Sequence, residues 1–269
     1  MGTLPAPLFQ PDHQSMSAHA HLPRLYIPAD TLPVAAPGAS CPLPPAQARY
    51  LGTVLRKQAG DSVRIFNGSM GEWLATLAHI RKDKGSLLLA ERLRAPPPPP
   101  ALVLAFALLK RDATDLVLRM GTELGVTSFQ PLITERTNTH RVNLDRLTAI
   151  ATEAAEQCER MDIPHVAEPC LLTTLLGSWP ENHRLFAAIE RTQDRGLTPN
   201  VTFRDARAGD GLLIGPEGGL SDAECQALLA RPFVAPVSLG ALVLRADTAV
   251  ASGLALMSDG LRSTQDQSQ

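Results

Sequence analysis

The chain has 269 residues, of which 44% are hydrophobic and 19% are charged, and its formal net charge is −2. These values predict a globular protein of one or two domains. No apolar run reaches the roughly 18 residues that a membrane helix needs, and the N-terminus lacks a signal-peptide pattern. Four cysteines without C-x-x-C spacing indicate reduced thiols in a cytoplasm, and neither they nor the seven histidines show the spacing of metal ligands.

The positive charge is concentrated near the front of the chain. Residues 22–94 carry ten Lys and Arg against five Asp and Glu, whereas residues 95–269 carry fifteen against twenty-one. A basic N-terminal module beside a larger acidic region suggests that the small module contacts a polyanion. An ordinary solvated face remains the alternative.

The first 94 residues divide into a tail and a small β-rich module. Residues 1–21 lack periodicity and are rich in Pro, Ser, His and Ala, which predicts a disordered tail. In residues 22–94, a helix over residues 46–57 precedes three predicted strands at 62–66, 72–80 and 86–93. The Asn67-Gly68 turn between the first two strands favours an antiparallel meander or a small barrel. Residues 95–100, Ala followed by five Pro, predict a stiff linker.

From residue 101 onward, strand and helix patterns alternate. The predicted strands cover residues 101–109, 126–133, 185–189, 212–214 and 233–237, and the predicted helices cover residues 112–125, 144–161 and a C-terminal stretch from about 247. A continuous apolar run such as residues 101–109 is typical of a strand buried on both faces. The alternation therefore predicts a mostly parallel sheet covered by helices.

Two glycine-bearing loops lie close together in the last quarter of the chain. Residues 211–224 read GLLIGPEGGLSDAE, in which an apolar strand breaks into a glycine loop, and Ser221 with Glu224 forms a capping box. Residues 238–252 read SLGALVLRADTAVAS and repeat the order of apolar strand, glycine loop and helix, with Gly240 in the loop. The two loops predict one ligand pocket at the carboxyl ends of neighbouring strands. Neither a P-loop nor G-x-G-x-x-G is present, and a tight strand-to-helix turn is the alternative.

These two stretches, LLIGPEGGLSDAE and LGALVLRADTA, resemble the RsmE-type 16S ribosomal RNA uracil-N3 methyltransferases of the SPOUT class, over roughly residues 22–260. Two further stretches, TELGV with LITER at 122–136 and EQCERMDIP at 156–164, resemble the same family. The resemblance implies an α/β fold with a SPOUT-like trefoil-knotted parallel sheet over residues 101–262, a short tail at 263–269, and a PUA-like small β-barrel that binds RNA over residues 22–94. It also implies a homodimer that acts on 16S rRNA of the small ribosomal subunit.

The resemblance further implies S-adenosylmethionine as the cofactor. Glycines would let the backbone approach its adenine and ribose, and aliphatic side chains would form apolar walls. Glu217 is a candidate ligand contact or a structural residue of the loop. The candidate cofactor-binding residues are Leu213, Ile214, Gly215, Pro216, Glu217, Gly218, Gly219, Leu239, Gly240 and Leu244.

The acceptor chemistry points to a cation near the target base. Uracil N3 becomes nucleophilic only when its proton leaves, and the resulting negative charge spreads over O2 and O4, where a cation would stabilise it. Arg245 is the candidate for that role, and Asp247 is a candidate base or a residue that orients Arg245. The family usually has Gly-Pro-Arg where this chain has Gly240-Ala241-Leu242, so an arginine of the family pattern is missing here.

Four arginines are candidate RNA contacts. By the resemblance, Arg24 and Arg56 align with RNA-contacting positions of the family's N-terminal PUA-like domain, with ordinary surface charge as the alternative. Arg136 and Arg160 lie at predicted strand or helix ends, where they could bind phosphate by bidentate hydrogen bonds. Two other functions stay open, namely a SPOUT methyltransferase of a different RNA and a non-catalytic RNA-binding factor of ribosome assembly.

Overall fold

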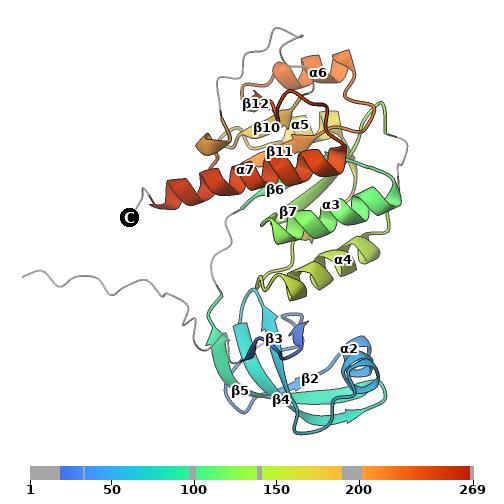
Figure 1. Cartoon of the computed structure of the whole chain (residues 1–269), viewed down its shortest axis with the longest axis vertical. Coiled ribbons are helices and arrows are strands. Elements are labelled where there is room, and N and C mark those ends of the chain that lie inside the picture. Colours follow the sequence, from blue (N-terminus) through green and yellow to red (C-terminus); the bar gives the residue numbers. More distant parts are fainter. Residues whose placement is uncertain (1–18, 33, 97–100, 138–140, 190–201, 267–269) are drawn as a thin grey trace, which may run out of the picture. The chain divides into compact units, whose positions relative to one another are not determined.

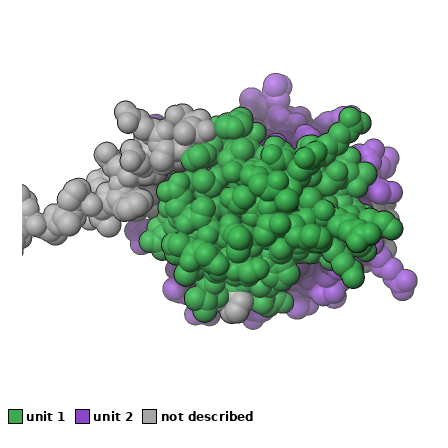
Figure 2. All heavy atoms as spheres, turned by 90° about the horizontal axis from the view of Figure 1, so that it is seen from below, with its two compact units in different colours: residues 1–98 green, residues 99–269 purple. Residues whose placement is uncertain are grey.

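The computed structural model describes residues 19–32, 34–96, 101–137, 141–189 and 202–266. The chain divides into two compact units, residues 1–98 and residues 99–269, which Figure 2 shows in separate colours. The boundary falls inside the proline run. Residues 1–18 of the predicted tail and residues 97–100 of the predicted linker lie outside the described residues.

The first unit is a five-stranded sheet with one helical segment. Its elements are β1 (Arg24–Tyr26), β2 (Ser40–Pro42), α2 (Pro45–Arg49), the π-helical turn η1 (Tyr50–Val54), β3 (Ser62–Asn67), β4 (Gly71–Arg81) and β5 (Lys84–Arg94). The strand order is β1-β3-β4-β5-β2. β3, β4 and β5 pair antiparallel in sequence order, which confirms the predicted meander of these three strands. β1 extends it by pairing parallel with β3, so the whole sheet is mixed. Pairing of distant segments such as β1 and β3 leaves no signature in local turn residues.

A buried ion cluster ties the strands of the first unit together. Glu72 on β4 has a side chain only 2% exposed, and its carboxylate accepts from Nε of Arg24 at 2.8 Å and from a terminal nitrogen of Arg64 at 3.3 Å. Arg94 of β5 bonds the other carboxylate oxygen. The Arg24 guanidinium also lies 3.5 Å from the centre of the Phe66 ring, a cation–π contact. These contacts pin β1, β3, β4 and β5 to each other around one carboxylate.

The second unit is a seven-stranded, all-parallel sheet. Its elements are β6 (Val103–Ala107), α3 (Arg111–Glu123), β7 (Ser128–Ile133), α4 (Leu144–Gln157), β8 (His165–Val166), β9 (Cys170–Leu171), α5 (Leu172–Ser178), β10 (Leu185–Ala188), the 3-10 turn η2 (Phe203–Asp205), β11 (Gly211–Ile214), α6 (Asp222–Leu229), β12 (Val234–Val237) and α7 (Ala246–Asp266). The strand order is β12-β10-β11-β6-β7-β8, and β9 also pairs with β7. The predicted parallel α/β sheet is confirmed.

Helices cover both faces of this sheet, as Figure 1 shows. Successive residues of β6 alternate between two cores: Leu104 and Phe106 pack with residues of α3, α4 and α7, whereas Ala105 packs with residues of α5 and α6. This period of two follows from the pleat of a strand. A continuous apolar run is therefore what a strand between two helical layers requires.

The long helix α7 lies close against β11 and η2. A Cβ added at Gly253 would lie 2.7 Å from Cδ2 of Leu212, and one added at Gly260 would lie 2.2 Å from the carbonyl oxygen of Phe203. η2 is held by Thr202 and Asp205: the Asp205 carboxylate accepts from the Thr202 backbone N at 2.8 Å and from its hydroxyl at 3.1 Å. These hydrogen bonds lower the pKa of Asp205 below its ordinary value. α7 reaches Asp266, so the predicted tail at 263–269 begins inside the helix.

Candidate functional site

A cavity of 640 Å³ opens at the carboxyl ends of β10, β11 and β12. These ends are in register, because Ala188 of β10 lies opposite both Ile214 of β11 and Val237 of β12. The lining residues are Arg136, Ala188, Ile189, Ile214, Gly215, Pro216, Glu217, Gly218, Gly219, Leu220, Cys225, Val237, Ser238, Leu239, Gly240, Ala241, Leu242, Val243, Leu244, Ala246 and Ala249. Open parallel sheets bind ligands at this edge.

The first glycine loop forms one rim of the cavity. It turns sharply after β11, with the Gly219 N–H donating to the Pro216 carbonyl at 2.8 Å. Gly219 has φ +71°, the left-handed region that glycine adopts without a steric cost. α6 then starts with the predicted capping box, in which Ser221 N donates to Glu224 at 2.9 Å and Glu224 N donates to the Ser221 hydroxyl at 3.3 Å. The sequence therefore predicted this strand, loop and helix start correctly.

The segment that follows β7 supports the glycine loop and the start of α6 by two hydrogen bonds. The Glu135 N–H donates to the Glu224 carboxylate at 2.8 Å, and Arg136 donates to the Gly218 carbonyl at 2.8 Å. The cap residue of α6 therefore also anchors a segment 89 positions earlier in the chain. Because Arg136 lines the cavity as well, its guanidinium stands at the rim beside the loop that it supports.

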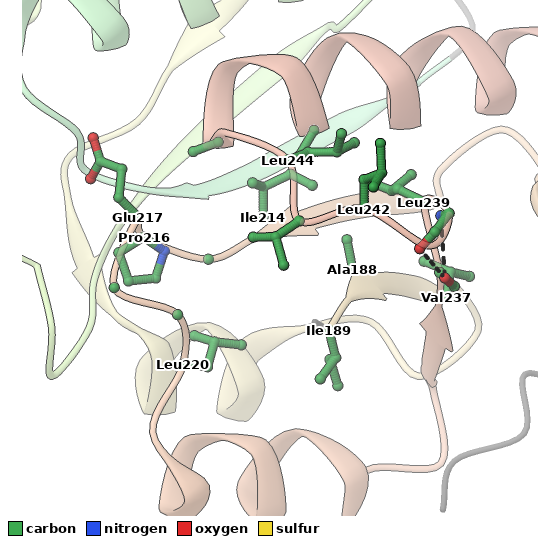
Figure 3. A pocket seen from close by; sticks show the side chains of 18 of the residues that line it. Ala188, Ile189, Ile214, Pro216, Glu217, Leu220, Val237, Leu239, Leu242 and Leu244 are labelled. Atoms are coloured by element: carbon green, nitrogen blue, oxygen red, sulfur yellow. Dashed lines mark hydrogen bonds between the residues drawn. The ribbon is translucent and has the colours of Figure 1, made fainter. Parts of the chain in front are cut away.

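Aliphatic side chains form the wall between the two loops. Ile214, Leu239 and Leu244 face the space from β11 and the second loop, and Ala188 and Ile189 face it from the end of β10 (Figure 3). Figure 3 shows the carboxylate of Glu217 pointing away from these side chains. The wall between the two loops is thus aliphatic, and the glycine loop adds backbone polar groups, of which the Gly218 carbonyl accepts a hydrogen bond from Arg136.

The second loop is the more open of the two. Ser238 Oγ accepts from the Gly240 N–H at 3.3 Å, and Gly240 has φ +123° with no atom within 4 Å of an added Cβ. Two apolar side chains follow on the rim, Leu242 at 80% and Val243 at 63% exposure. Ala241 and Leu242 stand where the resembled family has its Pro-Arg, so this rim carries aliphatic surface in place of a cation.

Nine of the ten predicted cofactor-binding residues line the cavity: Ile214, Gly215, Pro216, Glu217, Gly218, Gly219, Leu239, Gly240 and Leu244. The exception is Leu213, whose side chain is fully buried in the core beneath α5 and α6. This placement corrects the expectation that Leu213 forms a pocket wall. Neighbouring residues of a strand point to opposite faces, so Leu213 and Ile214 cannot both face the cavity.

The two predicted catalytic residues flank the cavity and do not line it. Arg245 is exposed and lies between Leu244 and Ala246, which are both lining residues. Asp247 accepts a hydrogen bond from the Thr248 N–H at 2.7 Å in the first turn of α7. Both residues are therefore next to lining residues in the chain and are not lining residues themselves.

The four predicted RNA contacts have different environments. Arg136 is at the cavity rim, and Arg56 is exposed with φ +53°. Arg160 donates to the carbonyls of Thr122 and Val126 at 2.7 and 2.8 Å, and it pairs with an aspartate two residues further on. Arg160 therefore supports the turn after α3 and does not line the cavity.

Arg24 has a side chain 3% exposed, and it belongs to the ion cluster of Glu72. Its burial lowers the pKa of its guanidinium, although the neighbouring carboxylate opposes that shift. The Arg24 guanidinium contacts both Glu72 and the Phe66 ring. Arg24, which aligns with an RNA-contacting position of the resembled family, therefore has a structural role in this protein.

Several lining residues were missed by sequence reasoning. Ala188 and Ile189 line the cavity because β10 lies between β11 and β12 in the sheet. Strand order is not encoded by local patterns, so no signal in residues 185–189 pointed to the site. Leu220 directly follows the predicted residue Gly219, and Val237 and Leu242 lie two positions from the predicted residues Leu239 and Leu244, so these three were within reach of sequence reasoning.

Two further properties of the described residues concern metal ligation and membrane insertion. No group of three His, Cys, Asp or Glu side chains is arranged to hold a metal ion in the part of the chain that the structure describes. In the same part, no helix is both long and apolar enough to span a membrane.

A parallel sheet covered on both faces, with an apolar cavity rimmed by glycine backbone at its carboxyl edge, defines an α/β domain suited to a small organic ligand. Comparison with known proteins places that domain in a family. A family model described as an RNA methyltransferase domain matches residues 96–258, and one described as an RNA methyltransferase PUA domain matches residues 43–89.

Named relatives agree with these matches. The chain is 34% identical to ribosomal RNA small subunit methyltransferase E of Rickettsia conorii, over 77% of this chain and 84% of the relative. It is 38% identical to the Synechocystis protein of the same name, over 81% of this chain and 72% of the relative. A crystal structure of ribosomal RNA small subunit methyltransferase E from Neisseria gonorrhoeae bound to S-adenosyl methionine has a TM-score of 0.78 at 27% identity, covering 90% of this chain and 98% of that chain. The chain belongs to this family of RNA methyltransferases.

Proposed function

We propose that the protein transfers a methyl group from S-adenosylmethionine to N3 of a uridine in 16S ribosomal RNA. The observation that carries the proposal is the cavity between the two glycine-bearing loops, which lies in the domain matched by the RNA methyltransferase model. Relatives named as small-subunit rRNA methyltransferases support the substrate class. The uracil-N3 specificity comes from the resemblance of the two loop sequences.

The cavity suits the proposed cofactor in size and chemistry. Its 640 Å³ falls within the about 300–1,000 Å³ common for small-ligand sites. Ile214, Leu239 and Leu244 offer apolar contacts, and the glycine rim offers backbone donors and acceptors to polar edges. When bound, S-adenosylmethionine supplies an electrophilic methyl group on a sulfonium. The residues of this chain then have to orient the reactants and exclude water.

In this proposal the acceptor base enters the mouth of the cavity beside Arg245 and Asp247, which are next to the lining residues Leu244 and Ala246 in the chain. We assign to Arg245 the stabilisation of negative charge on O2 and O4 as the proton leaves N3. Asp247, on the first turn of α7, is assigned to accept that proton or to orient Arg245. The target base has to leave its stack to reach this mouth, at a cost of a few kcal/mol.

Arg136 and Arg56 are the proposed RNA contacts, because both guanidiniums are accessible. We assign structural roles to Arg24 and Arg160, whose guanidiniums already bind protein carboxylates. A homodimer, a trefoil knot and a cytoplasmic location follow from the family resemblance and stay predictions. Light scattering of the purified protein tests the dimer.

The test combines binding with product analysis. Calorimetry measures S-adenosylmethionine binding, and incubation with small-subunit RNA followed by nucleoside mass analysis detects N3-methyluridine. Arg245→Ala should retain cofactor binding and lose most of the product, whereas Arg231→Ala, an exposed arginine at the end of α6, should retain both. A methylated product other than N3-methyluridine would refute the specificity.

A non-catalytic assembly factor is the second candidate. The observation in its favour is the second loop, where Ala241 and Leu242 occupy the place of the Pro-Arg in the family pattern. RNA binding without any S-adenosylmethionine binding in the same calorimetric experiment would establish this alternative over the enzyme.

A further inference from the structure

A second cavity lies where α3 and α4 begin, outside the site described above. It has a volume of 400 Å³ and is lined by Leu109, Arg111, Thr114, Arg141, Val142, Asn143 and Arg146. None of these residues lines the proposed cofactor cavity. Two segments about 30 positions apart in the chain thus come together around a space with three arginines and no acidic residue in its lining.

The arginines of this cavity differ in how their charges are compensated. Arg146 donates to both carboxylate oxygens of Asp115 at 2.5 Å, which ties α4 to α3. Arg111 and Arg141 are exposed, and the structure records no ion pair or side-chain hydrogen bond for either among the described residues. Two guanidiniums in the lining therefore have no recorded carboxylate partner among the described residues, and an anion would supply one.

The backbone amides at the N-termini of α3 and α4 also carry partial positive charge at this cavity. α3 has 13 residues, and its N-cap residue Lys110 makes no side-chain capping hydrogen bond, so the first amides of the helix keep their hydrogen-bonding capacity. At α4, the Asn143 side chain caps the helix by accepting from the Arg146 N–H at 3.0 Å. Helix N-termini carry partial positive charge, which adds to that of the arginines, while one carboxylate in the first turn of each helix, Asp112 and Asp145, offsets part of it.

The cavity lies at the same edge of the sheet as the proposed cofactor site. α3 follows the carboxyl end of β6, and β6 is the direct neighbour of β11, with Phe106 opposite Ile214. Neighbouring strands are about 4.8 Å apart, so an RNA strand with one nucleotide at the end of β11 can reach the start of α3 within a few nucleotides.

We propose that this cavity binds a backbone phosphodiester of the RNA substrate, with Arg111 and Arg141 as the phosphate-contacting residues. The inference rests on the proposed function, since it takes the occupant to be the RNA whose base enters the neighbouring site. Guanidinium groups bind phosphate oxygens bidentately, and such contacts set position and register without reading sequence. The site therefore contributes to RNA affinity and leaves methyl transfer in the bound complex unchanged.

The test is the full-length Arg111→Ala/Arg141→Ala variant compared with the wild type. Arg146 is left intact because its ion pair with Asp115 joins two helices. The matched control is Arg119→Ala/Arg231→Ala, which removes the same charge from two exposed positions that line neither cavity. Affinity for small-subunit RNA is measured by filter binding over a range of salt concentrations, alongside methylation kinetics and S-adenosylmethionine binding.

We expect the double variant to bind RNA roughly tenfold more weakly, because charge-assisted hydrogen bonds are lost. The negative slope of log affinity against log salt should become shallower by about 0.7–0.9 for one lost phosphate contact. KM for RNA should rise by a similar factor, while kcat and S-adenosylmethionine affinity stay at wild-type values. The control variant should keep the wild-type slope.

Four outcomes overturn the inference and can be told apart. If the wild type binds and methylates RNA and the double variant does so equally well, the phosphate site is refuted while the proposed function stands. If the control loses as much slope as the double variant, the effect is general charge. If calorimetry with inorganic phosphate shows binding that only the double variant loses, and RNA binding is unchanged, the occupant is a free anion. A wild type that neither binds nor methylates RNA refutes the proposed function and this inference together.

Discussion

The turn at Gly219 supports a sharp prediction, because a matched glycine stands beside it. Gly219 has φ +71°, whereas the adjacent Gly218 is not among the residues with positive φ. A Cβ at Gly218 would meet Cβ of Arg136 at 3.4 Å, an ordinary contact. Both glycines line the same cavity, so Gly219→Ala and Gly218→Ala change the same loop by the same atoms. Only the first places an alanine in the left-handed region.

The expected difference follows from backbone energetics. Alanine in the left-handed region costs about 1–2 kcal/mol, whereas alanine at a compatible glycine position stabilises by about 0.4–1 kcal/mol through the unfolded chain. A difference of about 2 kcal/mol between the variants corresponds to about 4–8 °C in Tm for a unit of this size. If the strained loop relaxes away from its turn, affinity for S-adenosylmethionine also falls by about 5- to 30-fold.

Thermal unfolding and calorimetry with S-adenosylmethionine test this prediction on Gly219→Ala, Gly219→Asn and Gly218→Ala. Asparagine tolerates the left-handed region better than alanine, so Gly219→Asn should melt between Gly219→Ala and the wild type. Equal melting temperatures for Gly219→Ala and Gly218→Ala, or a lower one for Gly218→Ala, would refute the assigned turn geometry.

Three further predictions concern stability, each measured by urea or thermal unfolding. Gly253→Ala forces a Cβ to 2.7 Å from a β11 side chain and should destabilise by about 1–3 kcal/mol, whereas Gly177→Ala, with nothing within 4 Å, should stabilise by about 0.5–1 kcal/mol; the reverse order would contradict the close packing of α7. Glu72→Gln removes the carboxylate shared by three arginines and should cost about 3–5 kcal/mol, against under about 0.5 for the exposed Glu91→Gln; equal effects would argue against the ion cluster. Because the folded-state pKa of Asp205 is lowered, its carboxylate stabilises the fold above the unfolded pKa, and this contribution disappears as pH falls through the folded pKa. Asp205→Ala should therefore be less stable than the wild type near pH 7 and equally stable at a pH below the folded pKa, and a deficit that persists there would exclude the ionised carboxylate as its cause.

The sequence alone determined the features that depend on neighbouring residues. The glycine loop at 215–219 and the Ser221–Glu224 capping box were both predictable, because turns and helix starts are decided by the residues within them. The alternation of apolar strands and amphipathic helices likewise predicted a parallel sheet covered on both faces, since the period of each element reflects which sides it buries. The family resemblance of the two loops added the proposed chemistry, which no local pattern carries.

Only the tertiary structure decided which distant segments meet. The position of β10 between β11 and β12 brought Ala188 and Ile189 into the cavity wall, and the pleat turned Leu213 away from it. Arg24 and Arg160 were predicted as RNA contacts from the sequence, and only the fold showed that a carboxylate lies beside each of them. The physical reason is that strand order and ion pairing depend on packing between residues far apart in the chain. Local propensity does not describe such contacts, because they form only when distant segments pack together in the core.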